Sequence, residues 1–194
     1  MLDEVRERGD SILFMKVGVH AQESLESIIR RKRQEIADSG FSMWGYGGNV
    51  CHPLTMVQPF AAEKAAQGHE IVLCMQPMAS NHRHPQVRAQ QYSVDGISWE
   101  TIDPGINVLG SRYALCLGEI RDVDEILHLG STRVAVGRSA GRLGSDYVGG
   151  RVDKACLDLV DDGVESPPLD IKFLAPLVPP YAVFLRNPPS VVNP

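Results

Sequence analysis

Long apolar runs are absent from this 194-residue chain. No run approaches the roughly 18 consecutive apolar residues that suggest a membrane-spanning helix. The chain opens with MLDEVRERGD, which is charged where a secretory signal carries an apolar run. We therefore expect a soluble protein of the cytoplasm, without a membrane partner.

Cysteine is also scarce, and the four cysteines Cys51, Cys74, Cys116 and Cys156 are widely spaced. No CxxC or HExxH motif is present, although closed zinc sites usually show such paired spacings. Cys74 and Cys116 lie within apolar runs, where a thiol commonly packs as a small hydrophobic group. We predict reduced cysteines and no metal site, and we assign no cofactor.

Basic residues are not in excess, since 19 Lys and Arg face 24 Asp and Glu, for a formal net charge of -5. Coverage of a nucleic-acid backbone needs a broad positive surface, so we exclude it as the main role. Charge is nevertheless segregated along the chain. Residues 131–154 hold five basic and two acidic residues, which leaves a local phosphate-binding patch open.

Apolar runs and helical periodicity predict the fold class. The predicted strands are residues 11–18, 70–75, 112–120, 132–136 and 154–160, and the predicted helices are residues 22–39, residues 59–67 and a short one around 123–128. Strands outnumber helices. We predict one α+β domain, residues 1–166, with a mixed, largely antiparallel sheet or half-open barrel and two or three helices packed on one side.

The run YSVDGISW predicts a β-hairpin, because Asp-Gly between alternating runs favours a two-residue type I′ turn. That register pairs Tyr92 with Trp99 and Val94 with Ile97. All four side chains should then lie on one face, which we expect to belong to the core.

Proline is concentrated at the end of the chain, with eight prolines in residues 167–194. Such a segment cannot be helical and should run extended. We predict that it is a tail docked on the domain or on a partner subunit, and a homodimer is one candidate assembly.

The first candidate site is WGYGGNVCHP, which combines glycines, aromatic rings and a thiol beside an imidazole. Trp44 and Tyr46 offer flat faces for stacking, and Asn49, Cys51 and His52 offer polar groups. We interpret it as the floor of a ligand pocket. The alternative is a tight crossing in which the aromatic residues cap the core.

The second candidate is GRSAGRLGS with the residues that follow it. Arg138, Ser139, Arg142, Tyr147 and Arg151 could bind phosphate, since guanidinium groups and glycine-exposed amides suit that anion. The spacing matches neither a dinucleotide-binding fingerprint nor a phosphate-binding loop of the Walker type. A flexible surface loop with solvated arginines is the alternative.

The third candidate is the pair His82 and His84, which would share one face of an extended segment. With His52 they are the candidate general acids or bases, because imidazole exchanges protons near neutrality. With Cys51, His52 or Cys74 the pair could also complete a metal shell, but no paired ligand motif accompanies it, and we favour a polar pair in a loop. His20 is a further lone candidate, or simply a residue at the start of a helix.

The run RRKR, residues 30–33, spreads around its predicted helix, and acidic residues of the same helix balance it. We interpret it as a solvated face. One resemblance lies in an opening strand and helix, in Trp44-Gly45 and in a later strand that reads ALCLGEI. In these features the chain resembles PUA-like β-barrels, which include modified-base readers. In a strand, His20 and a helix ending in Gly40-Phe41, it resembles ADP-ribosyltransferases. We carry no site residue over from either resemblance.

These features predict a protein that binds a small phosphate-bearing ligand, a nucleotide or a nucleotide within single-stranded nucleic acid, between the first two candidate loops. Whether transferase or hydrolase chemistry follows stays open. One alternative is a non-catalytic module that reads an exposed base. The other is a structural or assembly protein, which the apolar, proline-rich C-terminus would suit.

Overall fold

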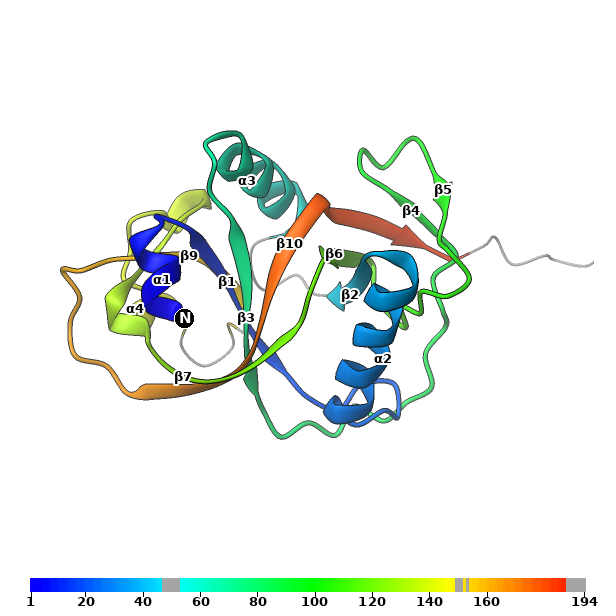
Figure 1. Ribbon diagram of the computed structural model, residues 1–194, viewed down its shortest axis with the longest axis horizontal. Coiled ribbons are helices and arrows are strands. Elements are labelled where there is room, and N and C mark those ends of the chain that lie inside the picture. The colour runs from blue at the N-terminus through cyan, green and yellow to red at the C-terminus, as the bar shows by residue number, and fades with distance from the viewer. Residues whose placement is uncertain (47–52, 149–151, 153, 188–194) are drawn as a thin grey trace, which may run out of the picture.

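The computed structural model describes residues 1–46, 53–148, 152 and 154–187. In that part of the chain it has the predicted α+β class, with four α-helices on a mixed, largely antiparallel open sheet (Figure 1). The helices are α1 (Leu2–Glu7), α2 (Leu25–Ser39), α3 (Leu54–Ala66) and α4 (Gly144–Tyr147). The strands are β1 (Ser11–Val17), β2 (Ser42–Tyr46), β3 (Ile71–Pro77), β4 (Gln91–Ser93), β5 (Glu100–Thr101), β6 (Tyr113–Leu117), β7 (Arg121–His128), β8 (Thr132–Val134), β9 (Lys154–Leu159) and β10 (Pro168–Arg186). No helix among the described residues is long and apolar enough to cross a membrane.

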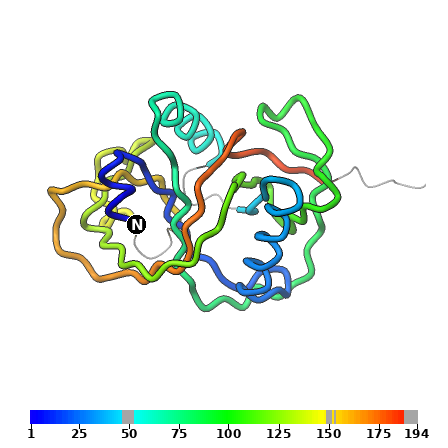
Figure 2. The backbone as a smooth tube through the Cα atoms, viewed as in Figure 1, coloured from blue at the N-terminus to red at the C-terminus, as the bar shows by residue number. Residues whose placement is uncertain are grey.

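The strands follow the order β2-β6-β10-β3-β1-β9-β8, and β7 and the β4–β5 pair attach to β10. Strands β1 and β3 are parallel, and every other pairing is antiparallel. Because β1 and β3 are parallel, the segments that follow them leave the sheet at the same edge. Figure 2 shows these two segments running together below α2.

Both faces of the sheet are covered. In β1 the side chains of Leu13 and Met15 pack in one core cluster, while Ile12 and Phe14 pack in another, as the two-residue period of a strand requires. Helices α2 and α3 contribute to the first cluster and α1 to the second. The two predicted helices, α2 and α3, thus share one side, whereas α1 and Tyr147 of α4, which the sequence did not predict as helical, pack on the other.

The predicted long helix is confirmed as α2, although it begins at Leu25 and not at residue 22. The Ser24 side chain accepts a hydrogen bond from the Ser27 amide (3.2 Å), and Gly40 ends the helix with a φ of 80°. The second helix, α3, begins five residues before Pro59, at Leu54. The helix starts earlier than predicted because Leu54 and Val57, in the added residues, are buried in the core.

Two local predictions were wrong. Residues 121–128 form strand β7 instead of a short helix, and β7 pairs with the first half of β10. In this segment Val123 and Leu127 pack against the core while their neighbours are exposed, which is a period of two. The apolar positions were too few for sequence periodicity to separate helix from strand.

The predicted hairpin exists, but its register differs. Tyr92 pairs with Glu100 and not with Trp99, and Ile97 is 82% exposed. The Asp95 carboxylate accepts hydrogen bonds from the amides of Ile97 (2.7 Å) and Ser98 (2.8 Å). This turn, closed by the Asp95 side chain, replaces the two-residue turn. It leaves Val94 and Ile97 exposed to solvent, so the prediction that they belong to the core was wrong.

The proline-rich segment contributes an interior strand. Residues 168–186 form β10, which lies between β6 and β3 and shifts register between Leu177 and Ala182. Its first half pairs with β7 and β3, and its second half with β6 and β4. Residues 188–194 lie outside the described part. Contact of this segment with a partner subunit stays a prediction.

Candidate functional site

A cavity of about 310 Å³ lies where β1 ends, next to α2 and β2. Its walls come from the turn after β1, from α2 and β2, from the segments after β3 and before β6, and from Lys154 at the start of β9. These elements are far apart in sequence. The parallel pairing of β1 and β3 brings the turn after β1 and the segment after β3 together.

Gly18 allows the segment after β3 to cross the end of β1. A Cβ at this position would lie 2.7 Å from the Met78 carbonyl oxygen and 2.8 Å from Ser80 Cβ. The Met78 amide donates to the Val17 carbonyl (2.7 Å), and the Ser80 hydroxyl donates to the Val19 carbonyl (3.0 Å). One wall of the cavity is thereby fixed to the sheet.

Gly45 has the same role on β2. A Cβ there would lie 2.4 Å from Ser111 Oγ and 3.0 Å from Val108 Cγ1. The segment before β6 can therefore lie directly against β2 only because residue 45 has no side chain.

The aromatic wall consists of Trp44 and Tyr46, two predicted site residues. Both are also core residues, with 7% and 4% exposure, so the pocket and core-capping interpretations describe the same position. The Lys154 Nζ lies 5.4 Å from the centroid of the Tyr46 ring. This is a cation–π contact, and it places an ammonium group beside the aromatic wall.

Two imidazoles stack at the cavity. The ring centroids of His20 and His82 are 4.8 Å apart, with an angle of 7° between the planes, and His84 meets the edge of His82 at 6.3 Å. His20 Nε2 lies 2.9 Å from the Leu109 carbonyl oxygen. A carbonyl oxygen only accepts, so this bond requires the proton on Nε2, and in a neutral ring Nδ1 is left as the acceptor. His20 and His82 line the cavity.

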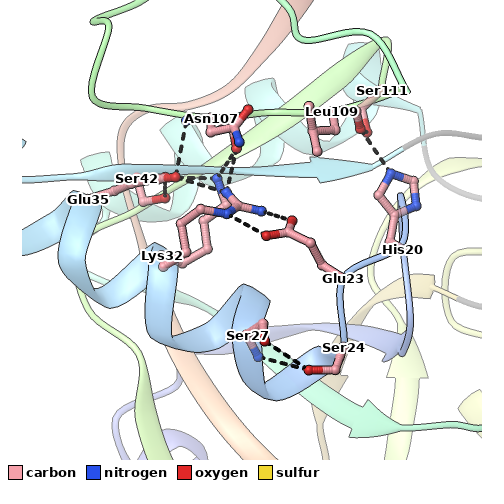
Figure 3. Close-up of polar contacts among 11 residues, drawn as sticks. His20, Glu23, Ser24, Ser27, Lys32, Glu35, Ser42, Asn107, Leu109 and Ser111 are labelled. Carbon is pink, nitrogen blue, oxygen red and sulfur yellow. Dashed lines mark hydrogen bonds and ion pairs between the residues drawn. The ribbon is translucent and has the colours of Figure 1, made fainter. Parts of the chain in front are cut away.

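A tight turn with unusual backbone angles presents His20. Ala21 and Gln22 have φ angles of 48° and 72°, a conformation that residues other than glycine rarely adopt. The amides of His20 and Glu23 bond each other's carbonyls at 3.1 Å and 2.8 Å. Both residues therefore sit at matched positions of one turn, facing the segment with Asn107 and Leu109 (Figure 3). Backbone strain of this kind tends to occur at functional sites.

A buried network of charges lies at the end of the cavity formed by α2. Glu35 is 3% exposed and accepts four hydrogen bonds. The donors are Arg31 Nη1 (2.9 Å), Lys32 Nζ (2.8 Å), the Ser42 hydroxyl (2.6 Å) and the Asn107 amide (3.1 Å). Arg31 also forms a two-pronged pair with Glu23. The solvated-face interpretation of RRKR was therefore wrong for Lys32, which is 3% exposed.

Burial and pairing oppose each other in this network. Burial disfavours the ammonium form of Lys32 and lowers its pKa to about 8, although Glu35 acts in the other direction. Burial also opposes the charge on Arg31, but hydrogen bonds to Glu23 and Glu35 outweigh it and raise the Arg31 pKa. Lys32 therefore loses its proton at a lower pH than an exposed lysine.

The second candidate loop lies elsewhere. Arg138 and Ser139 belong to a short 3₁₀ turn, Arg142 donates to the Asp146 carbonyl (2.7 Å), and Tyr147 packs against the core cluster that contains α1. The described residues that line the cavity include none of these four, and His84 is not among them either. Asn49, Cys51, His52 and Arg151 lie outside the described residues. No group of three His, Cys, Asp or Glu that could hold a metal occurs in the described part of the chain.

Lys154, Glu23 and Asn107 line the cavity but were not candidates from the sequence. Each lies in a segment without a motif, and only the sheet pairing and the α2 network bring them to it. Searches of protein-family models, of curated proteins and of solved structures return no match for this chain.

Proposed function

We propose that the cavity binds a mononucleotide. The observation that carries this proposal is the Lys154 ammonium over the Tyr46 ring, beside Trp44 and the stacked His20 and His82. Flat aromatic and imidazole groups suit a nucleobase, and the ammonium suits a phosphate. Both halves of the ligand then have a chemical counterpart in one cavity.

The size of the cavity supports a single nucleotide. Its volume of about 310 Å³ lies near the lower end of the range for small-molecule sites, roughly 300–1,000 Å³. A nucleotide within a single strand is the alternative, since the cavity could also take one splayed base. Comparing a mononucleotide with a short oligonucleotide separates the two.

Calorimetric titration tests the proposal. The ligands are AMP, GMP, CMP, UMP, inorganic phosphate and a mixed-sequence single-stranded hexanucleotide. We expect a mononucleotide to bind, and Lys154→Met to weaken binding roughly 10- to 150-fold, because charge-assisted hydrogen bonds contribute about 1.5–3 kcal/mol. Arg138→Met is the matched control, since Arg138 does not line the cavity. Absence of binding by all six ligands, or equal affinity for the Lys154→Met variant, would refute the proposal.

A second candidate function is acid–base chemistry on the bound nucleotide, as in a hydrolase or transferase. The hydrogen bond from His20 Nε2 to the Leu109 carbonyl favours it, because the bond leaves Nδ1 of the neutral ring able to take a proton. The test incubates the protein with nucleoside mono-, di- and triphosphates and follows product formation against pH. Turnover that is lost in His20→Gln while binding persists supports catalysis. Binding without turnover supports a non-catalytic module.

A further inference from the structure

The segment before β6 is held by its main chain at Asn107. The Asn107 carbonyl accepts from Arg31 Nη1 (2.7 Å) and Lys32 Nζ (2.8 Å), and its amide donates to Glu35 Oε1 (3.1 Å). Three charged side chains of α2 therefore fix one residue. Buried charge networks contribute little net stability on average but can fix a unique geometry.

The same segment is held from its other side by Arg88. The Arg88 Nη2 donates to the carbonyls of Asp103 (3.2 Å), Pro104 (2.8 Å) and Ile106 (2.7 Å). Ile106 itself is fully buried. The main chain just before Asn107 is thus anchored by Arg88 and that of Asn107 itself by α2, so it has little freedom to move.

The side chain of Asn107 contrasts with its main chain. Its Oδ1 is shielded from solvent and has no hydrogen-bond partner among the described residues, although the residue as a whole is only half-buried and lines the cavity. Buried polar atoms in folded proteins nearly always have a partner, so an unpaired one needs an explanation. A ligand that donates a hydrogen bond would supply the missing partner.

We propose that Asn107 is the residue that reads the base, through an amide that pairs with an exocyclic amine and the neighbouring ring nitrogen of an adenine nucleotide. The inference rests on the proposed nucleotide function. An asparagine amide offers one acceptor and one donor side by side, which matches the adenine amino group and N7. The terminal torsion of the side chain is soft, so the amide can turn toward the cavity while its main chain stays fixed.

The anchoring network allows the side chain of Asn107 to be changed without moving its main chain. Because Glu35, Arg31 and Lys32 bond only the main chain of Asn107, a change of its side chain leaves the network intact. An Asn107→Leu variant therefore keeps the segment in place and removes only the amide. It also removes an unpaired buried oxygen, so the melting temperature of the free protein should be unchanged or higher.

The experiment measures the affinities of AMP and IMP for the wild type, for Asn107→Leu and for the exposed control Asn187→Leu. IMP carries an oxygen in place of the amine, so the edge that contains N7 offers no donor to Oδ1. We expect the wild type and the control to prefer AMP roughly 5- to 150-fold, the discrimination of one two-pronged amide–base contact. Asn107→Leu should bind both ligands equally and melt no lower than the wild type.

Each other outcome has a defined meaning. Equal binding of AMP and IMP by the wild type, or a preference that survives in Asn107→Leu, overturns the role of Asn107 and leaves nucleotide binding standing. A melting temperature lowered by several degrees in Asn107→Leu shows that Oδ1 already has a structural partner, and this also overturns the role. If no nucleotide binds the wild type, the proposed function fails and this inference fails with it.

Discussion

The Nζ of Lys32 lies 2.8 Å from Oε2 of Glu35, three residues further along α2, and both side chains are almost fully buried. This ion pair joins α2 to β2 through Ser42 and to the cavity wall through Asn107. The cavity and the fold around α2 therefore depend on the same groups, and changes in this network should affect both.

Loss of Glu35 should be costly. Glu35→Ala leaves the buried Lys32 and the half-buried Arg31 without their shared carboxylate, and breaking a buried pair in this way typically costs about 3–5 kcal/mol. Urea unfolding measures the loss. Glu26→Ala, an exposed glutamate of the same helix, is the control and should change stability little. A Glu35→Ala protein as stable as the control would show that the network is not structural.

The lowered pKa of Lys32 predicts an unusual pH dependence. Its pKa is about 8 in the folded chain and about 10.5 in the unfolded one, so between these values the unfolded state binds more protons. The contribution of Lys32 to the free energy of unfolding must therefore rise with pH through this window. Relative to Lys32→Met, the wild type should gain about 2 kcal/mol between pH 7.5 and 9.5. A constant or shrinking difference would mean that the Lys32 pKa is not lowered.

Gly45 should not tolerate a methyl group. Gly45→Ala brings a Cβ against Ser111 Oγ and Cβ, at 2.4 and 2.9 Å, and must displace the cavity wall. We expect a loss of about 1–3 kcal/mol in thermal or urea unfolding, as for other overpacked sites. Ser111→Gly removes both Ser111 atoms and leaves only the contact with Val108 Cγ1, so it should restore part of the stability in the double variant. Additive losses in the double variant would show that the two residues do not contact each other.

Truncation after Ser166 removes β10, the strand between β6 and β3. Because this strand lies within the sheet, we expect the truncated chain to lose cooperative unfolding in calorimetry. Truncation after Asn187 keeps all of β10 and is the control, which should unfold close to the full chain. A cooperative transition after the first truncation would mean that residues 168–186 only dock on a domain that folds without them.

The fold class and three buried strands could be predicted from the sequence because β1, β3 and β9 are short apolar runs with clear boundaries. The positions of β7 and of the hairpin register could not. In β7 the apolar residues Val123, Ile126 and Leu127 also fit the spacing of a helix, and in the hairpin the Asp95 carboxylate sets the turn through hydrogen bonds that a residue pattern does not reveal. The interior position of β10 depends on partners distant in the sequence.

The candidate site shows the same limit. Trp44 and Tyr46 could be selected because aromatic rings beside glycines are unusual, and His82 because of its histidine neighbour. Lys154 and Asn107 could not, because an isolated lysine or asparagine carries no local signal until the sheet and α2 bring it to the cavity. His20 could be named but not ranked, since its turn lacks the glycine that usually marks positive φ angles.

The nucleotide site in this cavity can be tested with the two tryptophans of the chain. Trp44 lines the cavity, whereas Trp99 lies on the β4–β5 hairpin against Arg186. Amide and indole NMR signals are recorded during titration with AMP, and single Trp→Phe variants assign the two indoles. We expect the Trp44 indole and the amides of residues 18–20 and 107–111 to shift with one saturating curve, while the Trp99 indole stays in place. Shifts confined to the Trp99 hairpin or to residues 137–145, with Trp44 unchanged, would contradict a nucleotide site in this cavity.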